Sequence, residues 1–335
     1  MEKILTISIA AYNAVNDLDR CLTSMLQTEI ADLLDIVVVN DGSKDHTCEV
    51  AAKYVEAYPG IVRLIDKENG GHGSTINSSI QVAAGKYYKI VDSDDWVDKD
   101  GLEQLVKTLV QADTDLILNP YYIVNAETKE KELVRPFANA QVTGIVQTLE
   151  PETVMDIPMH SITYKTEIIK KMGPVISEKC FYVDMEYVIF PLVYVRNYLC
   201  LEAPVYNYLL GTATQSMNIA NVIKRRDQHL HVVKRITEFY CEKKDSMHPA
   251  VQKMILRRVQ IAAMVHYKIY FSMEAKDSQQ EIIAFDNWLK QAAPEVYSFS
   301  IGKFTRILEF NRCTNFRFYP ITSKSLKLWN QIFKK

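Results

Sequence analysis

The chain has 335 residues, of which 48% are apolar and 24% charged, a composition typical of a globular protein with a sizeable core. Its formal net charge of −2 argues against a general affinity for nucleic acid. Six scattered cysteines show neither a CxxC pair nor a zinc-ligand spacing, so reduced thiols are expected and a zinc site is not. A chain of this length is expected to form one large domain or two.

The apolar run at 4–11 lacks the basic lead-in of a signal peptide. No uninterrupted apolar stretch has the length needed to cross a bilayer. We therefore expect a cytoplasmic protein, with membrane contact at most peripheral, at the inner face of the membrane.

The N-terminal part alternates between apolar runs typical of strands and amphipathic runs typical of helices. The predicted order is strand 5–11, helix 17–27, strand 35–40, helix 44–58, strand 62–65, helix 75–84 and strand 87–91. Ser43 is placed to cap the second of these helices. This alternation predicts an α/β fold, a mostly parallel sheet flanked by helices.

The rest of the chain divides into two parts with different sequence patterns. Up to about residue 217 we expect, in order, helix 101–111, strand 115–118, a hairpin within 121–146, a helix starting at 151–155, an ambiguous segment 161–170, a helix ending near 194 and a strand over 199–209 that is broken at Pro204. Beyond it, long helical patterns of mixed charge cover 219–243, 249–273 and 277–292. The sequence thus predicts a domain over 1–217 and a helical C-terminal region over 218–335.

Four predicted strand ends carry polar or glycine residues, and ligands of such sheets bind beyond the carboxyl ends of the strands. The four ends are 11–13, 40–42, 68–70 and 92–94. Four independent ends with the same chemistry are hard to explain by chance. They predict a ligand site at this edge of the sheet.

Three acids, Asp92, Asp94 and Asp95, directly follow the last of these strands. Unpaired carboxylates are costly to bury, so they should face water or a cation. Asp92 and Asp94 point the same way off an extended backbone and suit one divalent ion. The alternative is an N-cap cluster for a helix near Lys99, capped by Asp94 or Asp98.

Two other interpretations fail on spacing. The loop 70–73, GGHG, follows the third strand and lacks the G-x-G-x-x-G pattern of a dinucleotide site. An EF-hand starting at Asp92 would have Trp96 as its fifth ligand and lacks the glycine required at the sixth position.

Five motifs, in their order and spacing, resemble family 2 glycosyltransferases of the GT-A fold over about the first 215 residues. They are ISIAAYN at 7–13, VVNDGSKDHT at 38–47, ENGG at 68–71, AGKYY at 84–88 and VDSDDW at 91–96. The resemblance implies a UDP-sugar donor and a divalent metal, Mn²⁺ or Mg²⁺. A hard cation on carboxylate oxygen would neutralise a pyrophosphate leaving group, in agreement with the acidic cluster.

The resemblance also implies roles for individual residues. Asp94 would face the metal, and Asp95 would either help it or cap the next helix. The donor site would include Ala11, Tyr12 and Asn13 along the nucleotide, Asp41 at the uracil, Asp92 at the ribose, and Gly70, Gly71, His72 and Ser93 around them.

Inversion at the sugar carbon needs a carboxylate that takes the proton of the acceptor hydroxyl. Asp184, in FYVDME at 181–186, resembles the second acid of the family's acidic pair, with Val183 at the place of the first. Asp184 could instead only cap its helix. We favour the base, because the neighbouring aromatic residues suit a sugar platform and would raise the pKa of Asp184. Glu186 is the second candidate.

One run departs from the family pattern, and two further residues, Lys89 and Gln215, have two alternative roles each. Residues 75–77, TIN, replace a common Ala-Arg-Asn run, and His72 or Lys89 would partly replace the missing arginine. For Lys89 a pyrophosphate contact and a structural pair with Asp92 or a neighbour are equally supported. Gln215, in the loop after Gly211, resembles a family loop that closes over the diphosphate and the acceptor, with a plain turn as the alternative.

The C-terminal segment 324–335 is basic and amphipathic. It could lie on an anionic membrane surface, dock on its own domain, or form a homo-oligomer through the C-terminal helices. Docking is favoured, because apolar residues on a terminal helix are usually buried.

We therefore expect an inverting, metal-dependent glycosyltransferase that transfers a hexose from UDP-glucose or UDP-galactose. The acceptor is expected to be a hydroxyl of a glycan, glycolipid or glycoprotein in cell-surface polysaccharide or glycoprotein synthesis. The alternative is a non-catalytic module that binds a nucleotide sugar or serves as a scaffold in a glycosylation complex. A nucleotidyltransferase is disfavoured, because no basic glycine-rich loop follows the first strand to receive a triphosphate.

Overall fold

The computed structural model describes residues 2–137, 144–151, 153, 157–173, 175–211, 219–298 and 304–332, with the backbone alone for 327–332. The chain forms two compact units. The first contains Met1–Gln215 and His248–Val251, and the second contains Ser216–Met247 and Gln252–Lys335.

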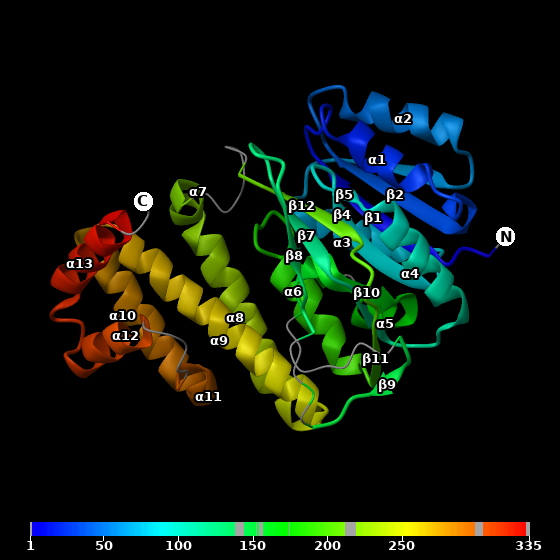
Figure 1. Ribbon diagram of the computed structural model, residues 1–335. Helices are drawn as coiled ribbons and strands as arrows, with labels where there is room; N and C mark the ends of the chain where they lie inside the picture. Colours follow the sequence, from blue (N-terminus) through cyan, green and yellow to red (C-terminus); the bar gives the residue numbers. More distant parts are fainter. Residues whose placement is uncertain are drawn as a thin grey trace. The chain divides into compact units, whose positions relative to one another are not determined.

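The first unit is built on an eight-stranded sheet with the strand order β3-β2-β1-β4-β10-β6-β11-β9 (Figure 1). The strands are β1 Leu5–Ala11, β2 Leu34–Asp41, β3 Val62–Lys67, β4 Tyr87–Asp92, β6 Leu116–Leu118, β9 Gln147–Thr148, β10 Ile162–Lys165 and β11 Asn197–Cys200. The first four are mutually parallel, whereas β10 is antiparallel to both neighbours. The mostly parallel α/β sheet expected from the sequence is confirmed.

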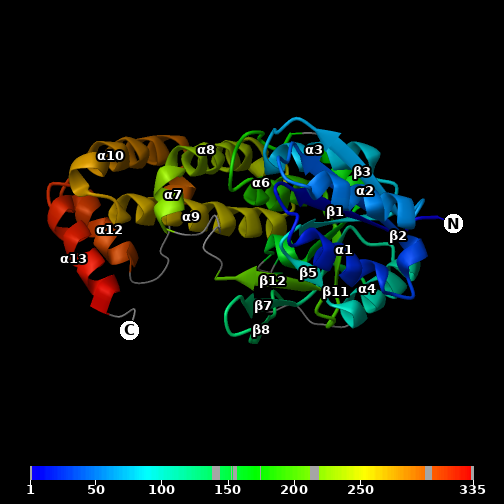
Figure 2. The ribbon, with the colours of Figure 1, turned by 90° about the horizontal axis from the view of Figure 1, so that it is seen from above.

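Helices cover both faces of this sheet (Figure 2). They are α1 Leu18–Leu26, α2 Thr47–Ala57, α3 His72–Val82, α4 Lys99–Gln111, α5 Thr166–Met172 and α6 Asp184–Ile189. α1 buries Leu18, Cys21, Leu22 and Met25, the i, i+3, i+4, i+7 stripe of an amphipathic helix. Every residue of β2 is buried, as expected for a β-branched strand covered on both faces.

A second sheet, of four strands in the order β5-β12-β7-β8, was not expected from the sequence. Its strands are β5 Trp96–Val97, β7 Tyr121–Asn125, β8 Lys131–Val134 and β12 Tyr206–Leu210. β7 and β8 are antiparallel and form the predicted hairpin. The strand predicted over 199–209 with a break at Pro204 is observed as two strands on either side of this proline: the first part belongs to β11 of the large sheet and the last part to β12.

Local predictions around the helix starts need correction. Ser43 does not cap α2, whose N-cap residue is His46. The Oγ of Ser43 instead accepts a hydrogen bond from the backbone N–H of Asn13 at 2.9 Å. Asp98 caps α4 by accepting from the backbone N–H of Gly101 at 3.1 Å, so the cap role does not fall to Asp94 or Asp95. The ambiguous segment 161–170 is strand β10 followed by α5.

Not every expected element falls on described residues. The helix start predicted at 151–155 lies mostly outside them, because 152 and 154–156 are not described. The predicted boundary at 217/218 falls at the end of another such gap, 212–218.

The second unit is helical. Its helices are α7 Ile219–Lys224, α8 Arg226–Lys243, α9 Pro249–Ser272 (of which Pro249–Val251 are grouped with the first unit), α10 Ala275–Ala292, α11 Pro294–Tyr297, α12 Phe304–Cys313 and α13 Tyr319–Ile332. The continuous helix predicted over 219–243 is interrupted at Arg225. None of the helices in the described parts of the chain has both the length and the apolar content to span a membrane.

Candidate functional site

The acidic cluster lies where β4 leaves the large sheet. A backbone hydrogen bond of 3.1 Å from Asp95 N–H to the Asp92 carbonyl closes a tight turn. The turn brings one carboxylate oxygen from each of Asp92, Asp94 and Asp95 within 4.8 Å of one another. Three negative charges at this distance repel each other, and oxygen ligands of this kind suit a hard divalent cation. The residues present therefore fit the metal that the sequence implies.

Asp95 is the buried member of the cluster and is 1% exposed. Its carboxylate accepts from the Tyr206 hydroxyl at 2.7 Å and from the backbone N–H of Leu209 at 2.8 Å. The Tyr206 hydroxyl in turn accepts the backbone N–H of Asp92 at 3.1 Å. Burial and the charges of Asp92 and Asp94 raise the pKa of Asp95 well above its usual value. Asp95 thus ties the acidic turn to strand β12 of the second sheet.

Asp94 is the exposed member of the cluster, whereas Asp92 is partly exposed and Asp95 is buried. Desolvation by the surrounding protein and repulsion from Asp92 raise the pKa of Asp94 to about 6. Arg20 donates to the Asp94 backbone carbonyl at 2.6 Å and lies over the ring of Trp96, 4.5 Å from its centroid. This arginine fixes the turn from the side of α1 and leaves the Asp94 carboxylate available.

Asp92 faces the glycine loop. One carboxylate oxygen lies 3.4 Å from Nε2 of His72, the first residue of α3, and both side chains are about one-third exposed. An imidazole at this place would balance negative charge when protonated. The structure therefore brings together His72 and Asp92, two residues that the sequence assigned to the donor site.

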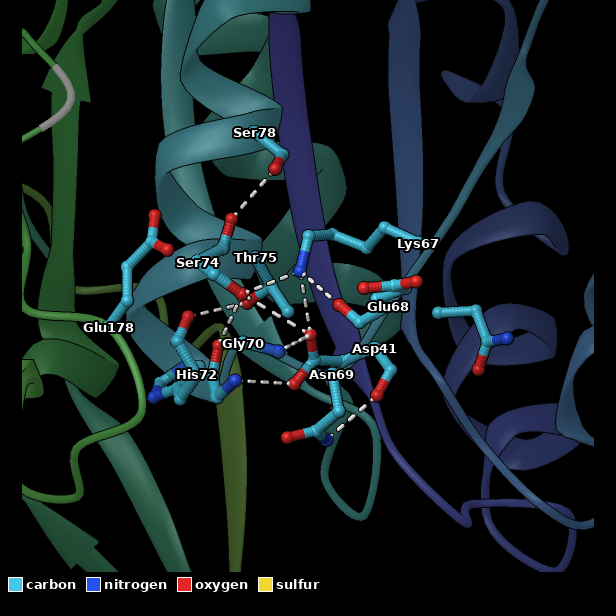
Figure 3. Close-up of polar contacts among 12 residues, drawn as sticks. Asp41, Lys67, Glu68, Asn69, Gly70, His72, Ser74, Thr75, Ser78 and Glu178 are labelled. Atoms are coloured by element: carbon cyan, nitrogen blue, oxygen red, sulfur yellow. Dashed lines mark hydrogen bonds and ion pairs between the residues drawn. The ribbon is translucent and has the colours of Figure 1, made fainter.

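Asp41, at the end of β2, organises the glycine loop (Figure 3). Its carboxylate accepts from the backbone N–H groups of Gly70 at 2.8 Å and Gly71 at 2.7 Å, and from Lys67 Nζ at 3.0 Å. A Cβ on Gly70 would meet Ser74 Oγ at 2.5 Å, and Gly71 has φ +81°. Both positions therefore need glycine for this loop to form.

The end of β1 lies beside the end of β2. Ala11 is buried, Tyr12 is 51% exposed and Asn13 has the left-handed φ of 51°. Asn13 Oδ1 accepts the backbone N–H of Lys44 at 2.9 Å, which holds the two strand ends together. The exposed Tyr12 ring is thereby presented at the carboxyl edge of the sheet. Ser93, in the acidic turn, is buried.

The segment that leads to Asp184 is fastened to the glycine loop and α3. The backbone N–H of Lys179 donates to the Gly70 carbonyl at 2.5 Å, and Asn77 Nδ2 donates to the Ile176 carbonyl at 2.9 Å. Lys179 and Tyr182 have φ values of 52° and 67°, a conformation that non-glycine residues rarely adopt. The connection from the donor residues to Asp184 is therefore held by specific polar contacts.

Asp184 is the first residue of α6 and is partly exposed. Its charge acts on Tyr208, whose pKa is raised first by burial and then by the charges of Asp95, Asp92, Asp184 and Asp94. The Tyr208 ring stacks on His160 at a centroid distance of 4.1 Å. The candidate base and the acidic turn thus share one electrostatic neighbourhood.

Two residues that the sequence offered as site candidates are buried among internal hydrogen-bond partners. Glu186 is fully buried and accepts from the backbone N–H of Ser177 at 2.7 Å and its hydroxyl at 2.9 Å, so it is a structural group and not an alternative base. Lys89 is also fully buried, and its ammonium donates to the carbonyls of His160 at 2.9 Å and Ile162 at 3.0 Å. Lys89 therefore has the structural role expected as one of its two alternatives, with these carbonyls and not Asp92 as its partners, and its full burial argues against a pyrophosphate contact.

Burial lowers the pKa of Lys89 to about 7. A neutral amine is therefore accessible to it in the core, where carbonyl groups are its partners. Gln215 lies outside the described residues.

Three residues that hold the site in place were not predicted from the sequence: Arg20, Asn77 and Tyr206. Arg20 lies on an ordinary amphipathic helix, and Tyr206 is 111 residues from the Asp95 that it contacts. Asn77 belongs to the run at 75–77 that lacks an arginine, and nothing in that run indicates its contact with Ile176. Contacts across such separations leave no local pattern in a single sequence.

Comparison with known proteins agrees with the family that the sequence motifs resemble. The model of the family "Glycosyl transferase family 2" matches residues 6–173. The chain is 36% identical over 121 residues to "Glycosyltransferase GlyA" of Streptococcus pneumoniae, covering 36% of this chain and 17% of that protein. It is 38% identical over 112 residues to "Uncharacterized glycosyltransferase YibD" of Escherichia coli, covering 33% of this chain and 32% of that protein. The matched parts thus span less than a third of the length of either relative.

A likeness to a solved structure extends further. The crystal structure of S. aureus TarS 1-349 in complex with UDP-GlcNAc superposes with a TM-score of 0.67 at 15% identity, over 97% of this chain and 92% of that one. At this identity the likeness concerns the fold, which is GT-A. With the family model matched over half of its length, the chain belongs to glycosyl transferase family 2.

Proposed function

We propose that the protein is an inverting, metal-dependent glycosyltransferase that transfers a hexose from a UDP-sugar to a hydroxyl of a glycan acceptor. The observation that carries the proposal is the convergence of the Asp92, Asp94 and Asp95 carboxylates at the end of β4, with Asp184 acting on the same neighbourhood. Support for a UDP-linked donor comes from the similar fold of TarS, solved with UDP-GlcNAc and with UDP.

The donor half would be built from the strand ends. Asp94 would hold a divalent Mn²⁺ or Mg²⁺, which when bound would neutralise charge on the diphosphate leaving group. Asp95, held by Tyr206, would fix the turn without coordinating the ion through its engaged oxygens. Ala11, Tyr12, Asn13 and Asp41 would line the nucleotide, and Asp92 would face the ribose.

The acceptor half would depend on Asp184. Its carboxylate would take the proton of the acceptor hydroxyl while that oxygen attacks the anomeric carbon from the face opposite to the diphosphate. The bond between the anomeric carbon and the diphosphate oxygen would break, and its electron pair would leave with UDP. The partly exposed Tyr208, stacked on His160, would form part of the platform beside this carbon.

Acceptors in cell-surface polysaccharide synthesis fit the names of the relatives, which include "Chondroitin synthase" of Pasteurella multocida. The chain spans 11% of that protein, so the acceptor stays a proposal. UDP-glucose and UDP-galactose remain the expected donors, and the test must also include UDP-GlcNAc.

The test is UDP release with Mn²⁺ across a panel of nucleotide sugars and acceptors. Transfer should fall on the order of 10³-fold in Asp94→Asn, because the main metal ligand is lost. The matched control is Asp98→Asn, a neighbouring acid that caps α4 and that asparagine can replace as a cap. If no donor is transferred or hydrolysed, the proposed enzyme activity is contradicted. Donor binding without turnover would favour the non-catalytic binding module instead.

A further inference from the structure

The last two helices of the chain carry an exposed surface that the proposed transferase does not use. Phe310 on α12 is 48% exposed, Phe318 immediately before α13 is 42% exposed and Ile321 on α13 is 64% exposed. The rings of Phe310 and Phe318 pack against each other with centroids 5.8 Å apart. We call the surface formed by Arg306, Phe310, Arg317, Phe318, Ile321 and Lys324 the terminal patch.

The opposite side of α13 is anchored to the second unit. Tyr319 is fully buried, and its hydroxyl donates to the Tyr270 carbonyl of α9 at 2.7 Å and bonds Ser278 of α10 at 2.7 Å. Ser323, one turn further, donates to the Phe271 carbonyl at 3.1 Å. Residues 319 and 323 share one helix face, so the orientation of α13 is set, and Ile321 and Lys324 must project away from α9 and α10.

The terminal patch is strongly basic. Arg306, Arg317 and Lys324 are exposed, and none of them forms an ion pair within the described parts of the chain. Residues 304–335 contain seven basic residues and one acid, whereas the whole chain has a net charge of −2. The rest of the protein therefore carries −8, and the positive charge is concentrated at this end.

Exposed aromatic and aliphatic side chains between unpaired cations match one partner best. We infer that the terminal patch binds the surface of an anionic lipid bilayer, with Phe310, Phe318 and Ile321 at the acyl boundary and the three cations at the lipid phosphates. Charge complementarity selects an anionic surface, and the apolar side chains select one with an apolar layer beneath its charges. A purely ionic polymer would leave these three side chains in water.

The experiment is co-sedimentation of the full chain with phosphatidylcholine vesicles, with and without phosphatidylglycerol. Binding is expected only to the anionic vesicles and should weaken as salt is raised. Each cation near such a surface contributes roughly fivefold to binding, so Arg306→Gln, Arg317→Gln and Lys324→Gln together should weaken it on the order of 100-fold.

A matched control removes the same charge elsewhere. Lys53, Lys276 and Lys290 are exposed lysines of α2 and α10, and their replacement by Gln should leave vesicle binding nearly unchanged. Equal loss in this control and in the patch variant would overturn the inference, because net charge alone would then explain binding.

A second variant tests the apolar part. Phe318→Ser with Ile321→Ser should weaken binding to anionic vesicles while leaving the helical circular dichroism intact, because both side chains are exposed. Full vesicle binding by this variant would overturn the inference in favour of a polyanion site. A native dimer in sedimentation velocity that this variant turns into a monomer, without vesicle binding by either, would overturn it in favour of self-association.

Discussion

The acidic turn of the first unit and the paired acids of the helical unit have opposite electrostatic surroundings. In the helical unit, Asp286 is held by Arg312 at 2.8 Å and Glu281 by Arg226 at 2.9 Å. In the first unit, Asp92, Asp94 and Asp95 face one another at the end of β4. Like charges gathered at one turn destabilise a fold, so the acidic turn is the part of the first unit that we propose for cation binding.

Two side chains with shifted pKa values, one in each unit, show the same contrast. The pKa of Asp94 is raised to about 6, so the folded first unit binds more protons than the unfolded chain between pH 6 and 4. His229 of the helical unit is buried against His266, with Nδ1 atoms 3.1 Å apart, and burial lowers its pKa to about 4. Acidification should therefore increase the contribution of Asp94 to the stability of the first unit and decrease the contribution of His229 to the stability of the second.

The largest expected effect lies in the acceptor half of the first unit. Asp184→Asn should lower the rate of sugar transfer about 10³-fold, because the acceptor hydroxyl loses its general base, while donor binding survives. Steady-state kinetics and calorimetric titration with UDP separate the two effects. Glu167→Gln, an exposed acid on α5, serves as the control. Unchanged transfer in Asp184→Asn would assign Asp184 to a structural role.

The next effect concerns the helical unit under acid. His229 is neutral in the folded protein, and its pKa falls from 6.5 to about 4, which corresponds to on the order of 3 kcal/mol of stability lost as pH falls through that window. Hydrogen exchange of peptides from α8 and α9, corrected for intrinsic rates, should show this loss. His229→Gln should flatten the pH dependence. Hydrogen-exchange protection of α8 and α9 that increases as the pH is lowered from 6.5 to 4 would contradict the burial of a neutral imidazole.

A smaller effect is expected from the bond between the acidic turn and β12. Tyr206→Phe removes the hydroxyl that donates to Asp95 and accepts from Asp92 N–H, and should lower the free energy of unfolding by about 2 kcal/mol. Urea unfolding measures the change, and Tyr122→Phe on the neighbouring strand β7 is the control. A loss no greater than that of the control would show that Asp95 does not depend on Tyr206.

The smallest effect is the pH dependence of metal binding. A cation competes with the proton on Asp94, whose pKa is about 6, so Mn²⁺ affinity should fall about tenfold per pH unit below that value and level off above it. Calorimetric titration of Mn²⁺ into the protein at several pH values provides the measurement. An affinity that does not change between pH 5 and 7 would remove Asp94 as the ligand.

The sequence alone determined the parts of the molecule that rest on local pattern. Periodicity and strand-end chemistry placed β1 to β4, the helices between them and the acids after β4, because side-chain spacing and turn residues are local properties. The motifs around Asp41, Gly70 and Asp94 were sufficient for the family. The long helices of the C-terminal region were visible for the same reason.

Tertiary structure alone decided which of the polar residues are available. It buried Lys89 and Glu186 among internal partners, joined Asp95 to Tyr206, and split the run at 199–209 between two sheets. Burial and hydrogen-bond partners are properties of segments up to about a hundred residues apart, which no local spacing encodes. A strand-end acid can therefore be found from sequence, whereas its freedom to bind a cation depends on what the rest of the fold brings to it.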